Sequence, residues 1–555
     1  MRGTPELTES AEIDERPDMA ARHKRLGMRT LLVSALTLLS RILGFVRDLL
    51  SATLFGDHSA VFDAFITAWR VPNLFRRFFG EGAISTSFQT AFTKVEGEQG
   101  EQAGGIFFRS TLRALFATLV VITLLTMALI MVMPDQMPIT GWHWLGADPD
   151  PVRDLALRVM PFVIFICLAA VGSAALHVRG RFTAPALGPV ALNLVWIGTL
   201  VWIGTQFGCT IDEGDFARHE EMAHTLAWGV LLAGAAQLAF LVPALGREGL
   251  LKSGKMAPGA PPVPGVGAVL RRAAPLAFGA AVYQINVMVD GFMAEGLLED
   301  GGPTLQYYAN RVQQFPLALV AIAATSAVFP ALQAYGQKGD LLSLRRLHDQ
   351  TQRAVAFLAV PAAVGLAILA QPILSVMFEH GAFGPEGVAR ASGALSWLAL
   401  AVLPAGATGL VARAFYSIGD FRTPVWISAF ALLLNIGLNT LFLVGWGMDV
   451  DGLALATAIT SWLGLAVMLP VFYSRQGMPR GPGGTLDSMA RTALAATASG
   501  AAAYWVHRYA SESFSPLWAL LLAMGSGLGA HLGVAFLVKS PELHRVLRRG
   551  AGPKP

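Results

Sequence analysis

The sequence predicts an all-α polytopic membrane protein of about fourteen transmembrane helices. Three observations predict this class: 54% of the 555 residues are hydrophobic, only 14% are charged, and apolar runs recur from end to end. Soluble domains carry roughly 25% charged residues. The net charge of +4 and the lack of interleaved basic and aromatic residues argue against nucleic acid as a partner.

The predicted spans follow from segment length, because a membrane-crossing helix needs about 20 mostly apolar residues. Fourteen segments qualify, at residues 30–56, 60–80, 106–133, 152–178, 184–206, 221–245, 268–297, 304–333, 350–377, 388–417, 423–446, 452–473, 487–508 and 514–539. Residues 1–27 are polar and lack the features of a cleaved secretory signal, so the first span should be retained. We expect this arm to be solvated and disordered.

Basic residues gather in every second loop. One set of loops contains Arg345, Arg346 and the C-terminal Arg548, whereas the other set contains acids such as Asp148 and Asp150. The positive-inside rule then places both termini in the cytoplasm, which requires an even number of spans.

A Pro/Gly-rich segment divides the spans into two groups. The predicted organisation is a polar cytoplasmic arm (1–27), an N-terminal lobe of six spans (28–250), a linker (251–267), a C-terminal lobe of six spans (268–475), and two final spans with a basic cytoplasmic tail (476–555). The lobes contain a weak repeat, because residues 68–88 and 309–329 share six identities at an offset of 241. This pairs the second span with the eighth and predicts two pseudo-symmetric lobes around a central site, as in transporters.

The arginines inside predicted spans include Arg41 and Arg47 in the first, Arg76 in the second and Arg311 in the eighth. An arginine at the centre of a membrane helix costs about 2.5–3.5 kcal/mol on insertion scales. These side chains should therefore face protein or a water-filled cavity.

Two interpretations of the arginines stay open. They can be structural, paired with Asp48, Asp63 and Glu81 or extended to the membrane surface. Alternatively they line an anion cavity, with Arg41, Gly44 and Asp48 on one face of the first span. Because a guanidinium forms bidentate hydrogen bonds with phosphate and keeps its charge, the second interpretation favours a diphosphate over a cationic drug.

A second polar group falls in the C-terminal half. Asp290 lies within the seventh span, Asn435 and Asn439 share a face of the eleventh, and Thr457 and Thr460 follow in the twelfth. Carboxylate, amide and hydroxyl oxygens could together coordinate Na⁺. Hydrogen bonding between helices is the alternative.

Sequence patterns of catalysis are not apparent. We find no Ser-His-Asp arrangement, no paired-carboxylate site and no nucleotide-binding loop. We therefore predict a transporter rather than an enzyme, with no cofactor other than a coupling Na⁺ or H⁺.

Five short motifs are more specific than the composition. They are SRILGFVRD at 40–48, DAF at 63–65, PNLFRR at 72–77, EGA at 81–83 and YYANRV at 307–312. Together they resemble the MurJ/MviN family, the lipid II flippases of the multidrug/oligosaccharidyl-lipid/polysaccharide exporter superfamily. The resemblance covers about residues 30–540.

The resemblance implies a function. Members move lipid II, the undecaprenyl-diphosphate-linked peptidoglycan precursor, from the inner to the outer leaflet of the bacterial cytoplasmic (inner) membrane by alternating access, for cell-wall synthesis. Implied partners are lipid II, membrane lipids and cell-wall synthesis proteins. The alternatives are an exporter of another polyprenyl-linked saccharide or of an amphipathic drug, and a non-transporting cell-wall scaffold.

The resemblance also implies site residues. The implied diphosphate-binding residues are Arg41, Arg47, Arg76 and Arg311. The implied cavity and gating residues are Gly44, Asp48, Asp63, Pro72, Asn73, Glu81 and Asn310. The implied sodium site is Asp290, Asn435 and Asn439, near Thr457 and Thr460. Asn310 and Asn439 stand where acids are common in the family, which removes a carboxylate from each place.

Overall fold

The computed structural model describes residues 16–77, 83–134, 143, 148–208, 216–252, 267, 284–318, 323–475 and 484–550. These residues form helices and turns and contain no β-strand, so the predicted all-α class is confirmed. Most of the predicted linker, residues 253–266, lies outside the described residues.

The helices fall into two consecutive groups. The first is α1 (Arg16–Phe55), α2 (Ala60–Phe75), α3 (Ala83–Val132), α4 (Asp150–Val159), α5 (Phe162–Val178), α6 (Thr183–Phe207) and α7 (Phe216–Arg247). The second is a helical segment at 284–297, α9 (Gly302–Pro316), α10 (Ala323–Gln337), α11 (Leu341–Ile368), α12 (Ala370–Phe378), α13 (Pro385–Leu400), α14 (Val402–Ser417), α15 (Arg422–Thr440), the π-helical turn η3 (Leu441–Gly445), α16 (Val450–Tyr473), α17 (Thr485–Ala510), α18 (Pro516–Leu537) and α19 (Pro541–Gly550).

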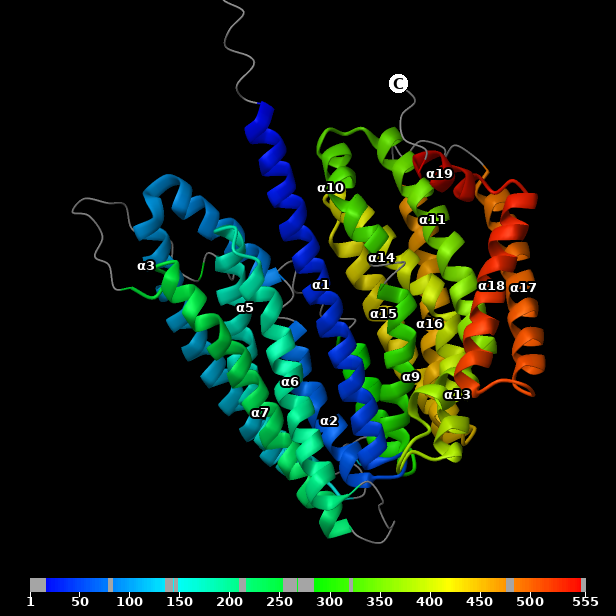
Figure 1. Ribbon diagram of the computed structural model, residues 1–555, viewed down its shortest axis with the longest axis horizontal. Coiled ribbons are helices and arrows are strands. Elements are labelled where there is room, and N and C mark those ends of the chain that lie inside the picture. The colour runs from blue at the N-terminus through cyan, green and yellow to red at the C-terminus, as the bar shows by residue number, and fades with distance from the viewer. Residues whose placement is uncertain are drawn as a thin grey trace, which may run out of the picture.

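Figure 1 shows these groups as two bundles, with α1 running between them. In the first bundle α1 packs along α6, α3 on α5, and α6 on α7. In the second, α13 packs on α9 and α16, and α17 packs on α11 and α18. The start of α1 and helix α19 lie at the same end of the molecule (Figure 1). The exact lobe boundaries stay predictions.

Nine helical stretches among the described residues are long and apolar enough to cross a membrane. The protein is therefore a multi-pass membrane protein, and the count of fourteen spans stays a prediction. α2 and α9 fall short because they have only 16 and 15 residues. Most residues of both helices are buried inside the molecule, so these helices can carry polar side chains that a lipid-facing helix would not.

Two boundaries differ from the sequence prediction. α1 begins at Arg16, so part of the predicted disordered arm continues the first helix. Within the predicted span at 304–333 the structure describes α9, followed by π-helical residues 317–318, and α10; residues 319–322 lie outside the described residues.

The internal repeat recurs in the backbone. α2 is followed by a π-helical turn at 76–77, and α9 by one at 317–318, which is the same offset of 241 residues. The next described helices are α3, from Ala83, and α10, from Ala323. The matching π-helical residues agree with the repeat seen in the sequence.

The two bundles touch at the end opposite the start of α1. There Ala382 N donates to Thr53 O at 3.0 Å, and Gly384 N donates to Asp57 Oδ1 at 3.1 Å. Gly301 has a φ of +89°, and a Cβ at this residue would lie 1.8 Å from Asp57 O. Only glycine fits at this position, because a Cβ would collide with the Asp57 backbone and φ is positive.

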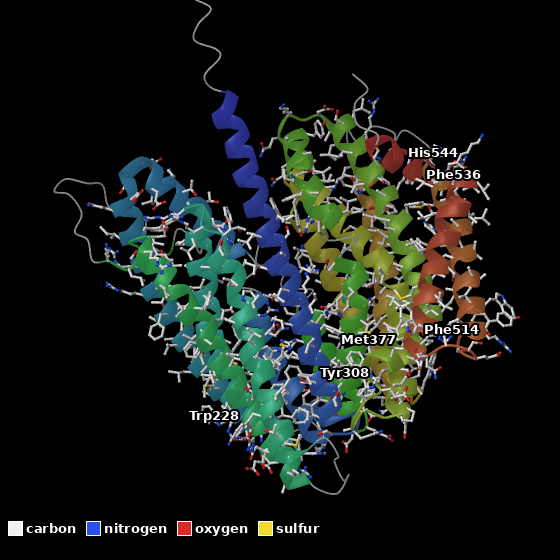
Figure 2. The ribbon with its side chains drawn as sticks, viewed as in Figure 1. Trp228, Tyr308, Met377, Phe514, Phe536 and His544 are labelled. Atoms are coloured by element: carbon white, nitrogen blue, oxygen red, sulfur yellow. The ribbon has the colours of Figure 1, made fainter. Side chains whose placement is uncertain are left out.

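Large apolar side chains cover the outside of both bundles. Trp228, Phe514 and Phe536 are each more than half exposed and point outward in Figure 2. Tyr308 is instead fully buried, with ring centroids 4.6 Å from Phe378 and 5.7 Å from Phe383. This apolar exterior is typical of a surface solvated by lipid rather than water.

Candidate functional site

A cavity of about 580 Å³ lies between the bundles, lined mainly by α1, α2, α5, α6 and α9. Its wall contains six arginines: Arg41, Arg47, Arg70, Arg76, Arg77 and Arg311. No aspartate or glutamate is among the described residues that line it. The cavity therefore attracts anions.

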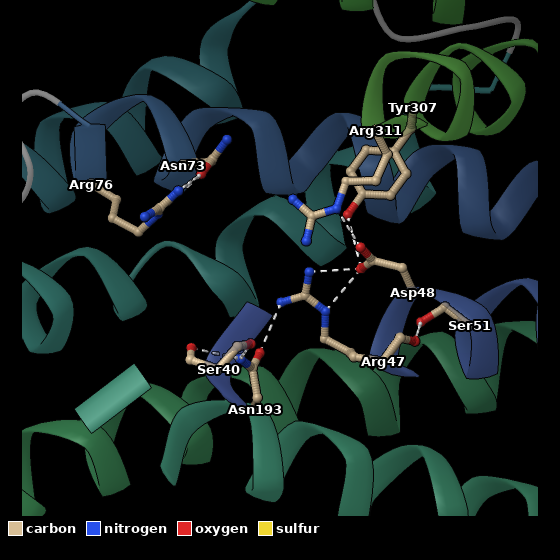
Figure 3. Close-up of polar contacts among 9 residues, drawn as sticks. All are labelled: Ser40, Arg47, Asp48, Ser51, Asn73, Arg76, Asn193, Tyr307 and Arg311. Atoms are coloured by element: carbon tan, nitrogen blue, oxygen red, sulfur yellow. Dashed lines mark hydrogen bonds and ion pairs between the residues drawn. The ribbon is translucent and has the colours of Figure 1, made fainter. Parts of the chain in front are cut away.

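One buried carboxylate behind the wall holds two of the arginines. Asp48 accepts hydrogen bonds from Arg47 at 3.0 and 2.7 Å and from Arg311 Nε at 2.5 Å (Figure 3). The Tyr307 hydroxyl donates to the same carboxylate at 3.3 Å. Since one negative charge faces two positive ones, the group keeps a net positive charge. It also joins α1 of the first bundle to α9 of the second.

Arg47 is held on its other side by α6. Its guanidinium lies 4.5 Å from the ring centroid of Trp196 and 3.5 Å from Asn193 Oδ1. Asn193 is itself fixed because its amide donates to Ser40 O at 3.0 Å. These contacts orient Arg47 toward the cavity without neutralising it.

Gly44 leaves room beside this group. A Cβ at Gly44 would lie 3.4 Å from Arg311 Nη2 and 3.8 Å from Asn193 Nδ2. Arg41 lies one helical turn before Gly44, is exposed, and has no ion pair or hydrogen bond with any described residue. Its guanidinium is therefore available to a ligand.

Arg76 lies at the C-terminal end of α2. Its guanidinium donates to Asn73 Oδ1 at 3.1 and 2.9 Å (Figure 3). Pro72 is buried inside α2 one residue before Asn73. Proline cannot donate a helical hydrogen bond, which loosens the backbone just before the π-helical turn at 76–77.

Asp63 does not line the cavity. Its carboxylate accepts from Gly301 N at 2.6 Å and Thr304 N at 2.9 Å, at the start of α9. One interpretation of the sequence pairs Asp63 with a membrane arginine. Asp63 instead caps the start of α9 in the second bundle. Its role in gating stays a prediction. Glu81 lies outside the described residues.

Asn310 lines the cavity but does not hold Arg311. Its amide donates to Gln306 O at 3.0 Å, one turn earlier in α9. Arg311 instead pairs with the carboxylate of Asp48, 263 residues earlier in the sequence.

The second polar group assembles around Asp290. Asn439 Nδ2 donates to Asp290 Oδ1 at 2.8 Å and to Asn435 Oδ1 at 3.1 Å, and Thr457 Oγ1 lies 3.5 Å from Asp290 Oδ2. The Thr460 hydroxyl donates to Ala456 O at 2.8 Å, within its own helix, and its place in the predicted site stays a prediction. Within the described part of the chain, no three His, Cys, Asp or Glu side chains gather as a metal site.

Several site residues escaped the sequence-based prediction. Tyr307 carried a signal, because it lies four residues before Arg311 on the same helical face. Asn193 is an amide inside an apolar span, which also marks function. Trp196 and Trp69 carried none, since aromatic residues are common in spans. Arg70, which is not among the predicted site residues, also lines the cavity.

Known proteins share this sequence and fold. The family model described as "Lipid II flippase MurJ" matches residues 51–525. The chain belongs to the MurJ family. A relative named "Probable lipid II flippase MurJ" from Vibrio cholerae is 32% identical over 492 residues, covering 87% of this chain and 89% of that one. One of the same name from Haemophilus influenzae is 31% identical and covers 77% and 82%.

Solved structures show the MurJ fold as well. A "Lipid II flippase MurJ, inward closed conformation" matches with a TM-score of 0.71 at 22% identity, covering 91% of this chain and 98% of that one. An inward-facing multidrug transporter of the MATE family matches with a TM-score of 0.61 at 13% identity, covering 80% and 98%. At these identities the likeness establishes a shared fold and no more.

Proposed function

We propose that this protein is a lipid II flippase of the bacterial inner membrane. It moves the undecaprenyl-diphosphate-linked peptidoglycan precursor from the inner to the outer leaflet. The observation that carries the proposal is the interbundle cavity with six arginines and no lining carboxylate among the described residues. Membership of the MurJ family supports it.

The diphosphate enters this cavity while its polyprenyl tail stays in lipid. Arg41 is free to bind a phosphate oxygen first. Arg47 and Arg311 then exchange part of their bonding with Asp48 for bonds to phosphate, which is favourable because two guanidiniums share that single carboxylate. Arg76 supplies a further charge from α2.

The bundles then rock about the cavity. With both termini in the cytoplasm, the contacts of Thr53, Asp57 and Asp63 close the periplasmic side, and the protein faces inward. Breaking these contacts and closing the other side would release the head group outside. Moving two negative charges outward across about 100 mV contributes roughly 4.6 kcal/mol, at about 2.3 kcal/mol per charge.

The test uses cells in which this protein is the only flippase. A membrane-impermeant enzyme added outside cuts the lipid II that has reached the outer leaflet. Arg41→Ala and Arg311→Ala should lose most of the cleavable lipid II at matched membrane levels, while total lipid II is maintained. Arg346→Ala, at an exposed arginine of α11, is the matched control and should behave as wild type.

Normal cleavage in both cavity variants would overturn the proposal and favour a non-transporting scaffold. Cationic drug efflux that survives Arg311→Ala would instead favour a drug exporter. We expect cell-wall synthesis proteins that consume lipid II outside as partners.

We also propose that Na⁺ resets the empty carrier through the Asp290 group. The donors fit a hard cation, because Asp290, Asn435 and Thr457 each bring an oxygen to one buried place. Asn439 Oδ1 is buried without a hydrogen-bond partner, which a bound cation would satisfy. The ion would compensate the charge of Asp290. A purely structural network of hydrogen bonds is the alternative outcome.

A further inference from the structure

An aromatic cluster forms the cavity wall beside Arg47. Trp69 of α2, Phe162 of α5 and Trp196 of α6 all line the cavity. The Trp69 ring centroid lies 5.1 Å from that of Trp196, at 89°, and 4.9 Å from that of Phe162, at 61°. These edge-to-face contacts hold the rings rigidly. Trp69 remains half-buried, so part of its surface faces the open space.

Two buried polar groups of the same wall lack partners. The Trp196 side chain is 4% exposed, yet its indole Nε1 makes no hydrogen bond. Gln237 of α7 also lines the cavity, is 9% exposed, and leaves Oε1 unpaired. Buried donors and acceptors are normally paired, because leaving one unpaired is costly. A donor and an acceptor left open on one cavity wall suit a ligand rich in hydroxyl groups.

The aromatic cluster adjoins the anion-binding group directly. The Arg47 guanidinium stacks 4.5 Å from the ring centroid of Trp196. A ligand that uses both places needs an anionic group next to a ring with apolar C–H faces and hydroxyls on its edge. A sugar bonded through one oxygen to a phosphate has this combination.

We propose that Trp69, Phe162 and Trp196 form a saccharide subsite for the sugar next to the diphosphate. The inference rests on the proposed function and adds where the head group binds. Trp69 stacks on the C–H face of the sugar, Trp196 donates its N–H to a hydroxyl, and Arg47 holds the phosphate. The subsite thereby distinguishes a glycosyl diphosphate lipid from the bare diphosphate lipid.

The experiment compares two probes on the full chain in nanodiscs. One probe is lipid II, and the other is undecaprenyl diphosphate, which has the same tail and diphosphate but no sugar. Trp69→Ala should weaken lipid II binding about 10-fold and leave undecaprenyl diphosphate within 2-fold of wild type. Trp196→Phe keeps the aromatic ring, removes the N–H, and should show a smaller loss of the same selectivity. Arg47→Ala should weaken both probes.

Trp228→Ala is the matched control, because Trp228 is 59% exposed on the outer face of α7 (Figure 2). It should bind both probes as wild type does. If Trp69→Ala misfolds, Trp69→Leu and Trp196→Phe carry the same comparison. Equal losses for both probes, or no loss for either, would overturn the subsite while the proposed function stands. Wild type that binds neither probe would overturn the proposed function itself.

Discussion

The arginine-lined cavity and a smaller neighbouring cavity differ in electrostatic character, because Asp290 balances the single arginine of the smaller one. The first contains six arginines and no acid among its described lining residues. The second, of about 60 Å³, contains Asp290, Thr457 and neutral amides. Arg70, Val287 and Asn310 line both cavities. The two cavities are therefore adjacent and share a wall, and the proposed anion and cation sites lie on either side of it.

Arg70 is the charged part of that wall. It extends from α2 into the second bundle, where it donates to Val287 O at 3.3 Å and Gln306 Oε1 at 3.0 Å. Gly291 makes this possible, since a Cβ there would lie 2.3 Å from the guanidinium. A change at either cavity can thus reach the other through one side chain.

The largest expected effect is at Asp48, because its loss would leave two arginines of the first cavity without their shared carboxylate. Asp48→Ala removes the carboxylate shared by Arg47 and Arg311. Breaking a buried ion pair by removing one partner costs about 3–5 kcal/mol. The thermal unfolding midpoint in detergent should fall sharply, and lipid II exposure with it. Asp487→Ala is the control, because this acid is 59% exposed in its pair with Arg491. Equal midpoints for the two variants would contradict the assignment.

The second prediction isolates the cation compartment. Replacing Na⁺ by choline should lower the unfolding midpoint of wild type. It should leave the unfolding midpoint of Asp290→Asn unchanged. At Na⁺ 100-fold above its Kd, the ligand stabilises the folded state by about 2.7 kcal/mol. Thr460→Val should keep the Na⁺ response, because that hydroxyl bonds within its own helix. A wild-type midpoint that ignores Na⁺ would leave the Asp290 group as a structural network.

The third prediction concerns the shared wall. Gly291→Ala forces the Arg70 guanidinium away from its acceptors and should cost about 1–3 kcal/mol, as overpacking does. In an Arg70→Ala background the same substitution should cost little, which a double-mutant cycle measures. Gly437→Ala in α15 is the control, because no atom lies within 4 Å of its Cβ position. Additive effects at positions 291 and 70 would show that they are independent.

The smallest effect lies outside both cavities, at the pair of Asp449 and Arg390. Burial tends to raise the pKa of the Asp449 carboxyl, but hydrogen bonds from Arg390 and Val450 N, with the Arg390 charge, lower it below its ordinary value of 3.8. The pair is therefore stabilising above pH 3.8, and this contribution is lost as the pH falls through the lower pKa of the folded state.

Asp449→Asn tests this pair. Because Asp449 is 40% exposed, the variant should be destabilised by less than about 1 kcal/mol at pH 7. Its difference from wild type should shrink as the pH falls below 3.8, in unfolding midpoints measured across that range. If the difference in unfolding midpoint grew as the pH fell, the stabilising role of this pair would be contradicted.

The sequence by itself determined the helical class, the apolar exterior and the helices that carry the charges. Hydropathy and helical periodicity are local properties, so they place Arg47 and Arg311 inside spans and predict that they avoid lipid. The repeat offset of 241 residues also holds in the backbone, at the turns 76–77 and 317–318.

Only the tertiary structure decided which groups meet. It pairs Arg311 with Asp48 rather than with its neighbour Asn310. It also bonds Asp63 of the first bundle to the start of α9 in the second. It brings Trp196 against Arg47 and bonds the Thr460 hydroxyl within its own helix. The physical reason is that periodicity defines the faces of one helix, whereas partners depend on which helices become neighbours. That choice is made by packing between residues hundreds of positions apart.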